Sequence, residues 1–86
     1  MAKIEIYTTQ TCPFCTAAKN LLREKNAAFS EINVGADRAL RDAMKARANG
    51  KHTVPQIFIN DRHIGGCDDL YALDSAGKLD ERLGLA

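Results

Sequence analysis

The feature that most constrains this chain is a Cys-x-x-Cys motif between a predicted strand and a predicted helix. Residues 3–8 alternate apolar and polar side chains, which is typical of a strand. After a short polar loop, the motif Cys12-Pro13-Phe14-Cys15 opens an apolar stripe with helical spacing, formed by Phe14, Ala17, Ala18, Leu21 and Leu22. Pro13 suits the first helical position, because its missing N–H is not needed there. The spacing therefore predicts a helix from about residue 13 to about residue 25, with both cysteines at its N-terminus.

The rest of the chain predicts an α/β fold. Residues 29–34 resemble a second strand, and Asp37 is a suitable cap for a second helix that ends at Asn49-Gly50. Residues 54–59 and 63–65, separated by a polar turn, predict a β-hairpin. Asp68 and Asp69 are predicted to cap a third helix that ends near Gly77, and residues 79–83 a last short helix. Because a strand–helix–strand unit implies a parallel pair, we expect a small four-stranded mixed sheet with helices on both faces.

Composition limits the size and the setting of the fold. A chain of 86 residues has room for one modest core, so residues 1–86 are predicted to form a single domain. The net charge is +1 and its charges are spread along the chain, so no nucleic acid or membrane partner is expected. The chain enters a strand pattern at once, which leaves no room for a signal peptide. With three cysteines rather than a larger even set, these features predict a cytoplasmic protein, and a monomer is expected.

The two cysteines of the motif are predicted to differ in reactivity. A cysteine attacks as its thiolate, and the unpaired N–H groups and dipole at a helix N-terminus favour that anion at Cys12. Cys15 lies three residues further on the same side of the helix, where it is expected to be more buried. Cys12 is therefore predicted to be the nucleophile and Cys15 the resolving thiol of a redox-active disulfide, and the ring of Phe14 can flank a bound substrate.

Structural zinc is the alternative for these cysteines. His63 and Cys67 have His-x-x-x-Cys spacing, so four ligands of suitable types exist together with Cys12 and Cys15. Zinc pairs usually sit on a tight knuckle, however, whereas this motif opens a long apolar helix directly after a strand. That context is typical of thioredoxin-like redox sites, so no metal is expected. The side chain of Cys67 is then either a passive small residue or a third redox thiol. Elsewhere we expect Leu70, Tyr71 and Leu73 in the core and His52 and His63 at the surface.

Three segments together resemble a dithiol glutaredoxin of the bacterial glutaredoxin 3 type. They are Tyr7-Thr8 with Thr11-Cys12-Pro13-Phe14-Cys15, Thr53-Val54-Pro55-Gln56-Ile57-Phe58-Ile59, and His63-Ile64-Gly65-Gly66-Cys67-Asp68-Asp69-Leu70. The similarity covers essentially the whole chain. It implies a thioredoxin-like fold and an enzyme, a glutathione-disulfide oxidoreductase. Such an enzyme reduces protein disulfides and protein–glutathione mixed disulfides, with glutathione as the reducing co-substrate.

The resemblance also implies where glutathione binds. Thr53 and Val54 would pair their backbone with its cysteinyl part, beside a cis peptide bond before Pro55. The backbone N–H groups of Cys67 and Asp68 would hold the carboxylate of the γ-glutamyl end, and the side chain of Asp68 or Asp69 its ammonium. Gly65 and Gly66 let the backbone come close. The implied binding residues are Phe14, Thr53, Val54, Pro55, Gly66, Cys67, Asp68 and Asp69.

The chain departs from the family pattern in three places. Thr9 stands where many glutaredoxins have a lysine, which leaves the helix end and either Lys51 or Arg47 to supply positive charge. Phe14 replaces the commoner tyrosine, and the loop over residues 49–52 is about one residue longer.

Two further functions are possible for a protein of this kind. One is a dimer that bridges an iron–sulfur cluster through Cys12 and two glutathiones, which the rigid Pro13 disfavours. The other is a thioredoxin, or a redoxin reduced by thioredoxin reductase. A thioredoxin would be longer and would carry a Trp before its motif, and this chain contains no Trp. The segments at Thr53 and Gly65, which resemble glutathione-binding segments, argue against both a thioredoxin and a redoxin reduced by thioredoxin reductase.

Overall fold

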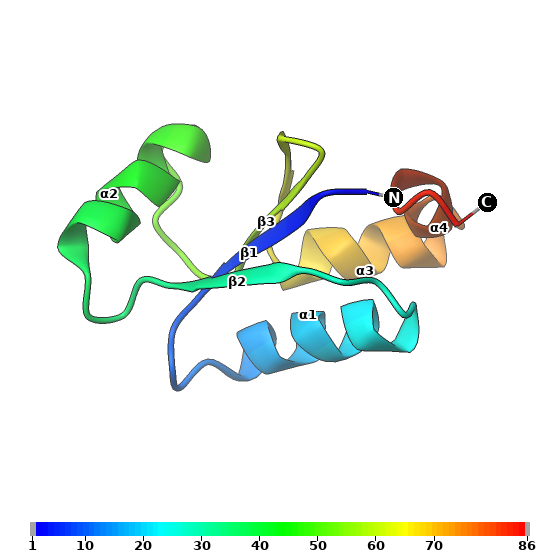
Figure 1. Ribbon diagram of the computed structural model, residues 1–86, viewed down its shortest axis with the longest axis horizontal. Coiled ribbons are helices and arrows are strands. Elements are labelled where there is room, and N and C mark those ends of the chain that lie inside the picture. The colour runs from blue at the N-terminus through cyan, green and yellow to red at the C-terminus, as the bar shows by residue number, and fades with distance from the viewer. Residues whose placement is uncertain (1, 86) are drawn as a thin grey trace.

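The computed structural model describes residues 2–85, and its elements follow the predicted order (Figure 1). The strands are β1 (Ile4–Thr8), β2 (Ser30–Asn33), β3 (Gln56–Ile59) and β4 (Arg62–Gly65). The helices are α1 (Pro13–Glu24), α2 (Arg38–Arg47), α3 (Cys67–Ser75) and α4 (Leu79–Arg82). Within the described part of the chain, no helix has the length and apolar character needed to cross a membrane.

The four strands form one mixed sheet in the order β2-β1-β3-β4, which confirms the predicted fold class. β1 pairs parallel with β2 and antiparallel with β3, and β3 and β4 form the predicted hairpin. Pairing of β3 begins where Gln56 lies opposite Tyr7, two residues later than predicted. Pro55 has no N–H to donate to the ladder, so the segment before Gln56 stays outside the sheet.

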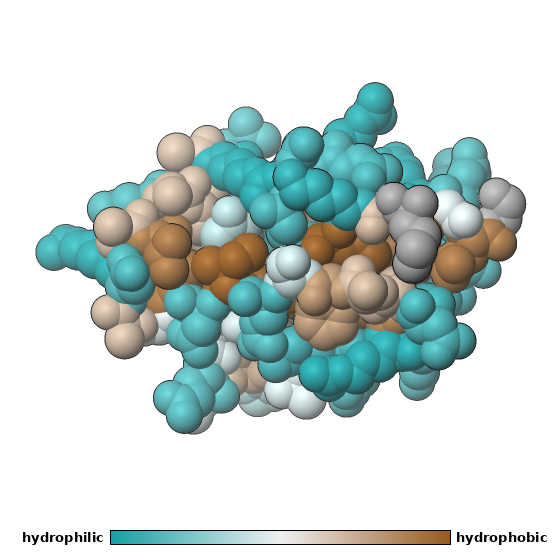
Figure 2. All heavy atoms as spheres, viewed as in Figure 1, coloured by the Kyte–Doolittle hydropathy of each residue, from teal (hydrophilic) through white to brown (hydrophobic). Residues whose placement is uncertain are grey.

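Helices cover both faces of this sheet, as predicted. Figure 1 shows α1 and α3 on one side of the strands and α2 on the other. Alternate side chains of β1 enter different cores: Ile4 and Ile6 pack with residues of α1 and α3, whereas Tyr7 packs with Met44 of α2. Figure 2 shows apolar residues along the long axis of this view, bordered by hydrophilic residues. Both sheet faces are therefore buried, which matters for Gln56, the one polar residue of β3.

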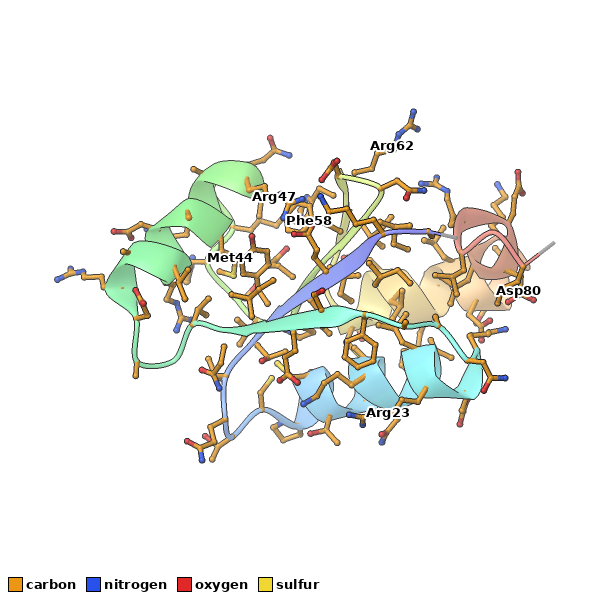
Figure 3. All side chains as sticks on the ribbon, in the orientation of Figure 1. Arg23, Met44, Arg47, Phe58, Arg62 and Asp80 are labelled. Atoms are coloured by element: carbon orange, nitrogen blue, oxygen red, sulfur yellow. The ribbon has the colours of Figure 1, made fainter. Side chains whose placement is uncertain are left out.

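Arg47 fastens the end of α2 to the sheet. Its Nη2 donates to Glu5 Oε1 at 2.7 Å and its Nη1 to the Tyr7 hydroxyl at 3.1 Å. The guanidinium lies 4.0 Å from the centre of the Phe58 ring, and Figure 3 shows Arg47 and Phe58 side by side between α2 and the sheet. The hydrogen bond from Arg47 lowers the pKa of Glu5. These contacts fix the start of the loop that leads from α2 to Thr53.

The start of α3 differs from the prediction. The helix begins at Cys67 with Gly66 as its N-cap, so Asp68 and Asp69 lie inside the first turn rather than before it. Asp69 still serves the cap from within, because its Oδ2 accepts the N–H of Gly66 at 2.9 Å.

One core prediction on α3 was wrong. Leu70 is fully buried and Leu73 packs against the same core, but Tyr71 is 41% exposed. The Tyr71 hydroxyl donates to the carbonyl of Ala17 at 3.2 Å, so the ring lies across the surface of α1.

Candidate active site

Cys12 occupies the N-cap of α1 and is partly exposed. Its Sγ accepts the N–H of Cys15 at 3.1 Å and lies 3.8 Å from the carbonyl oxygen of Val54. The first turn of α1 carries no acidic residue. The predicted position of Cys12 is confirmed, and the positive end of the helix is available to a thiolate there.

Cys15 is buried directly beneath this site, with 1% of its surface exposed. Burial, together with its hydrogen bond to Cys12, raises the pKa of the Cys15 thiol to about 12. At neutral pH Cys15 is therefore a thiol, and its backbone N–H stabilises the sulfur of Cys12. The two sulfurs therefore differ in exposure: Cys12 is accessible, as expected for a nucleophile, and Cys15 is buried, as expected for a resolving thiol.

The segment before β3 passes next to Cys12. The Val54–Pro55 peptide bond is cis, as the resemblance implied. Thr53 is exposed and Val54 is half-buried, whereas Pro55 is buried. Since Thr53 and Val54 precede the sheet ladder, their backbone forms a short edge outside the sheet, beside the nucleophile.

Gln56 supports this edge from the interior of the protein. The sequence did not identify Gln56 as a residue of the site. Its side chain is 1% exposed, and its Nε2 donates to the carbonyl of Thr53 at 3.0 Å and to Thr53 Oγ1 at 3.2 Å. Its Oε1 lies 2.6 Å from Nε2 of His63. His63 was predicted at the surface, but it is partly buried, and burial lowers its pKa. The available signal was a polar residue inside the apolar run of residues 54–59.

The N-terminus of α3 forms the opposite wall of the site. Cys67 is 7% exposed, and burial followed by the charge of Asp68 raises the pKa of its thiol. A side chain at Gly66 would meet the carbonyl oxygen of Pro55 at 3.4 Å, so α3 begins in contact with the segment before β3. Gly65 has φ +123°, and a side chain there would collide with Asp69. The backbone N–H groups of the first turn of α3 have no partners within the helix and are open to a ligand.

A groove of about 210 Å³ joins these three segments. Its lining contains all eight residues for which the resemblance implied a binding role: Phe14, Thr53, Val54, Pro55, Gly66, Cys67, Asp68 and Asp69. Lys51 and Gln56 complete it. The structure therefore brings the predicted residues together from separate parts of the chain. Lys51 contributes a positive charge to the lining, while Asp68 and Asp69 contribute negative charge.

Of the two cations considered as substitutes for a lysine at position 9, only Lys51 lines the groove. Arg47, the other cation considered, is paired with Glu5 and with Asp61 and does not line the groove. Two carboxylates thus already neutralise the charge of Arg47, whereas Lys51 is exposed. Thr9 itself lines a separate polar hollow with Arg41, whose Nη2 donates to the carbonyl of His52 at 3.0 Å.

The zinc hypothesis finds no ligand cluster in the part of the chain that the structure describes. Among residues 2–85, no group of three or more His, Cys, Asp or Glu side chains is arranged to hold a metal ion. The ring of His63 faces Gln56 and stacks at 5.0 Å on Phe58. All three cysteines are free.

Comparisons with known proteins point to one family. A family model described as Glutaredoxin matches residues 4–64. The chain is 62% identical over 82 residues to a probable glutaredoxin of Synechocystis sp., covering 95% of this chain and 93% of that protein. It is 54% identical over 83 residues to Glutaredoxin 3 of Escherichia coli (strain K12), covering 96% and 99%.

Solved structures agree with the sequence relatives. A solution structure of glutaredoxin from Brucella melitensis has a TM-score of 0.86 at 50% identity, covering 99% of this chain and 91% of that one. A crystal structure of a buckwheat glutaredoxin–glutathione complex has a TM-score of 0.87 at 28% identity, covering 96% and 77%.

Proposed function

The chain belongs to the glutaredoxin family of thiol–disulfide oxidoreductases, and from this premise we propose that glutathione is its electron donor. The substrates we propose are protein–glutathione mixed disulfides and protein disulfides, reduced through Cys12 and Cys15. One observation carries the proposal: Cys12 lies at a helix N-terminus beside a groove lined by all eight residues expected to hold glutathione.

The first reaction needs only Cys12. Its thiolate attacks the glutathione sulfur of a mixed disulfide, and the protein thiolate leaves and takes a proton from water. Glutathione is then joined to Cys12 through a disulfide while its peptide part occupies the groove. The thiolate of a second glutathione attacks the sulfur of the bound glutathione. This step releases glutathione disulfide and restores the Cys12 thiolate.

Protein disulfides require Cys15 as well. Cys12 attacks one sulfur of the substrate disulfide, and Cys15 then attacks the Cys12 sulfur to release the reduced substrate. The proximity of Cys12 is among the causes that raise the pKa of Cys15. Because the Cys12 sulfur is uncharged once it is part of a disulfide, Cys15 can lose its proton more readily at the step that needs it. Two glutathiones then reduce the Cys12–Cys15 disulfide.

The groove matches the chemistry of glutathione, which carries two carboxylates and one ammonium. The backbone of Thr53 and Val54 lies outside the sheet ladder and provides an edge to which the cysteinyl part can add as a strand. The open N–H groups at the start of α3 suit the γ-glutamyl carboxylate, and Asp68 or Asp69 suits its ammonium. The glycine carboxylate is left for Lys51, which supplies the cation that Thr9 cannot.

The proposal extends to the setting of the protein. We place it as a monomer in a reducing compartment such as the cytoplasm, where free thiols persist and glutathione is abundant. Its partners are then glutathione and disulfide-containing or glutathionylated proteins, with no nucleic acid or membrane involved.

The test is turnover of a glutathione mixed disulfide coupled to glutathione reductase and NADPH. Wild type should be active, Cys12→Ser inactive, and Cys15→Ser active on the mixed disulfide but inactive on a protein disulfide. Absence of glutathione-dependent turnover by the wild-type protein would refute the proposal. A brown colour with visible absorbance after anaerobic purification would instead favour the cluster-bridged dimer.

A further inference from the structure

The buried amide of Gln56 lies directly behind the backbone edge of Thr53 and Val54, which is proposed to bind glutathione. Gln56 is one of two polar residues that are fully or almost fully buried among residues 2–85, the other being Thr8. Burying an amide without partners is costly, but Gln56 is hydrogen-bonded at both its nitrogen and its oxygen. Its partners lie in two different segments, the loop before β3 and the strand β4. Gln56 therefore links the groove to the hairpin.

The hydrogen-bond pattern fixes the orientation of each group. The carbonyl of Thr53 can only accept, so the group that faces it at 3.0 Å must be the NH₂ of Gln56. The remaining amide oxygen is then an acceptor, and Nε2 of His63, at 2.6 Å, must carry its proton. One directed chain results: His63 donates to Gln56, and Gln56 donates to Thr53.

His63 is itself held in place by the core. Its ring lies 5.0 Å from that of Phe58, with a tilt of 34°. On Phe58 rests the guanidinium of Arg47, which the ion pair with Glu5 anchors. Rotation of the His63 ring away from Gln56 would break this stack, so the donor at Nε2 is preorganised. The directed chain thus begins at His63 on β4 and ends at Thr53 on the exposed edge of the groove.

We propose that Gln56 is a positioning residue for glutathione, and that His63 acts through it. The amide of Gln56 holds the carbonyl and hydroxyl of Thr53 toward the interior. The neighbouring backbone groups of Val54 are then left facing the groove in the orientation that strand addition needs. This inference rests on the proposed function, because it concerns how the same groove receives glutathione.

The primary test replaces Gln56 by methionine, which keeps the length and the burial of the side chain and removes its hydrogen bonds. Steady-state kinetics with a glutathione mixed disulfide should show an apparent KM that is roughly five- to tenfold higher, the equivalent of about one hydrogen bond. The kcat should stay within about twofold, since Cys12 and Cys15 are untouched. His63→Phe keeps the ring on Phe58 and removes the donor, so it should raise KM by roughly two- to threefold.

The double variant tests whether His63 acts through Gln56. If it does, Gln56→Met combined with His63→Phe should have the KM of Gln56→Met alone. A KM equal to the product of the two single effects would contradict that part of the proposal.

A matched control separates positioning from a general loss of stability. Thr8 is also fully buried, and its hydroxyl donates to Glu31 Oε2 at 2.7 Å, on the β2 side of the sheet. Thr8→Val should lower the melting temperature as Gln56→Met does, but it should leave KM within about twofold of wild type. If KM rises in Thr8→Val as much as in Gln56→Met, or stays unchanged in Gln56→Met, the proposal is overturned.

A second measurement does not depend on turnover. The ¹⁵N order parameters of Thr53 and Val54 should fall in Gln56→Met from about 0.85 toward 0.6, while those of β3 stay high. If wild type has no glutathione-dependent activity, the proposed function fails, and this measurement still decides whether Gln56 fixes the edge. Unchanged order parameters would contradict the positioning mechanism.

Discussion

Two helices begin with a cysteine beside the same groove, and the two cysteines have opposite surroundings. Cys12 precedes α1 as its N-cap, is partly exposed, and is followed by a first turn without acidic residues. Cys67 is the first residue of α3, is 7% exposed, and is followed directly by Asp68 and Asp69. Both sulfurs thus lie at the positive end of a helix, but only that of Cys12 is open to a substrate.

The difference shows that a helix N-terminus does not by itself create a reactive thiol. At α3 the burial of Cys67 and the charge of Asp68 both raise the pKa of the thiol, against the effect of the helix end. The carboxylate of Asp69 already accepts the N–H of Gly66. The two helix ends are consequently suited to different tasks, α1 to a reacting sulfur and α3 to the charged end of a ligand.

The largest expected effect separates the two cysteines by mutation. Cys12→Ser should lower turnover of a glutathione mixed disulfide by roughly a thousandfold or more, because a hydroxyl cannot replace the thiolate. Cys67→Ser should stay within about twofold, because its proposed contacts use the backbone. Coupled assays of both variants at equal concentration check this. A comparable loss in Cys67→Ser would make Cys67 part of the chemistry.

The next largest effect is expected at the N-terminus of α3, which is proposed to bind the charged end of glutathione. Asp69→Ala removes the acceptor of the Gly66 N–H and a carboxylate of the groove, so the apparent KM should rise roughly tenfold. Asp74 on the same helix serves as the control, since it pairs with Lys25 at 2.8 Å and does not line the groove. Equal KM changes in Asp69→Ala and Asp74→Ala would show that α3 contributes only stability.

Alkylation kinetics compare the thiols without any substrate. At pH 7 iodoacetamide should modify Cys12 at least about a hundredfold faster than Cys15 or Cys67, because the thiolate is the reactive form. Cys15, with a pKa of about 12, should become reactive only in strongly alkaline solution. Peptide mass spectrometry at timed quenches measures the three rates. Faster labelling of Cys67 than of Cys12 would reverse the comparison.

The smallest effect tests why Cys67 is unreactive. The charge of Asp68 disfavours the Cys67 thiolate, so removing that charge lowers the pKa of this thiol. The pH at which Cys67 begins to be alkylated should therefore shift downward in Asp68→Asn. It should remain in place in Asp74→Asn, a matched neutralisation farther along α3. No shift in Asp68→Asn would contradict the assignment of part of this effect to the charge of Asp68.

Much of this site was predictable because its residues lie in short contiguous motifs. The cysteine pair, the Thr53–Pro55 segment and the Gly66–Asp69 segment each carry their own pattern, and the strand order follows from the spacing of the elements. The element ends were less predictable, as at α3, where two aspartates were predicted to cap the helix but lie within its first turn. Their placement depends on Gly65, whose missing side chain leaves room for Asp69.

The supports of the site could not be predicted, since they depend on contacts between distant segments. Gln56 interrupts an apolar run, and its burial follows only from the cover that α2 gives to that face of the sheet. His63 was predicted at the surface because no residue near it in the sequence indicates that it contacts the amide of Gln56. Tyr71 has the spacing of a core residue, but its hydroxyl keeps it at the surface of α1. The binding roles of the groove residues and the single-domain organisation remain predictions.

The most direct test of the account is to locate the glutathione that the protein acquires during catalysis. The Cys15→Ser variant, which cannot resolve the intermediate, is mixed in its reduced form with glutathione disulfide and mapped by peptide mass spectrometry. We predict one glutathione per chain, on Cys12. A glutathione found on Cys67 instead, or no adduct at all, would contradict the assignment of α1 to chemistry and α3 to binding.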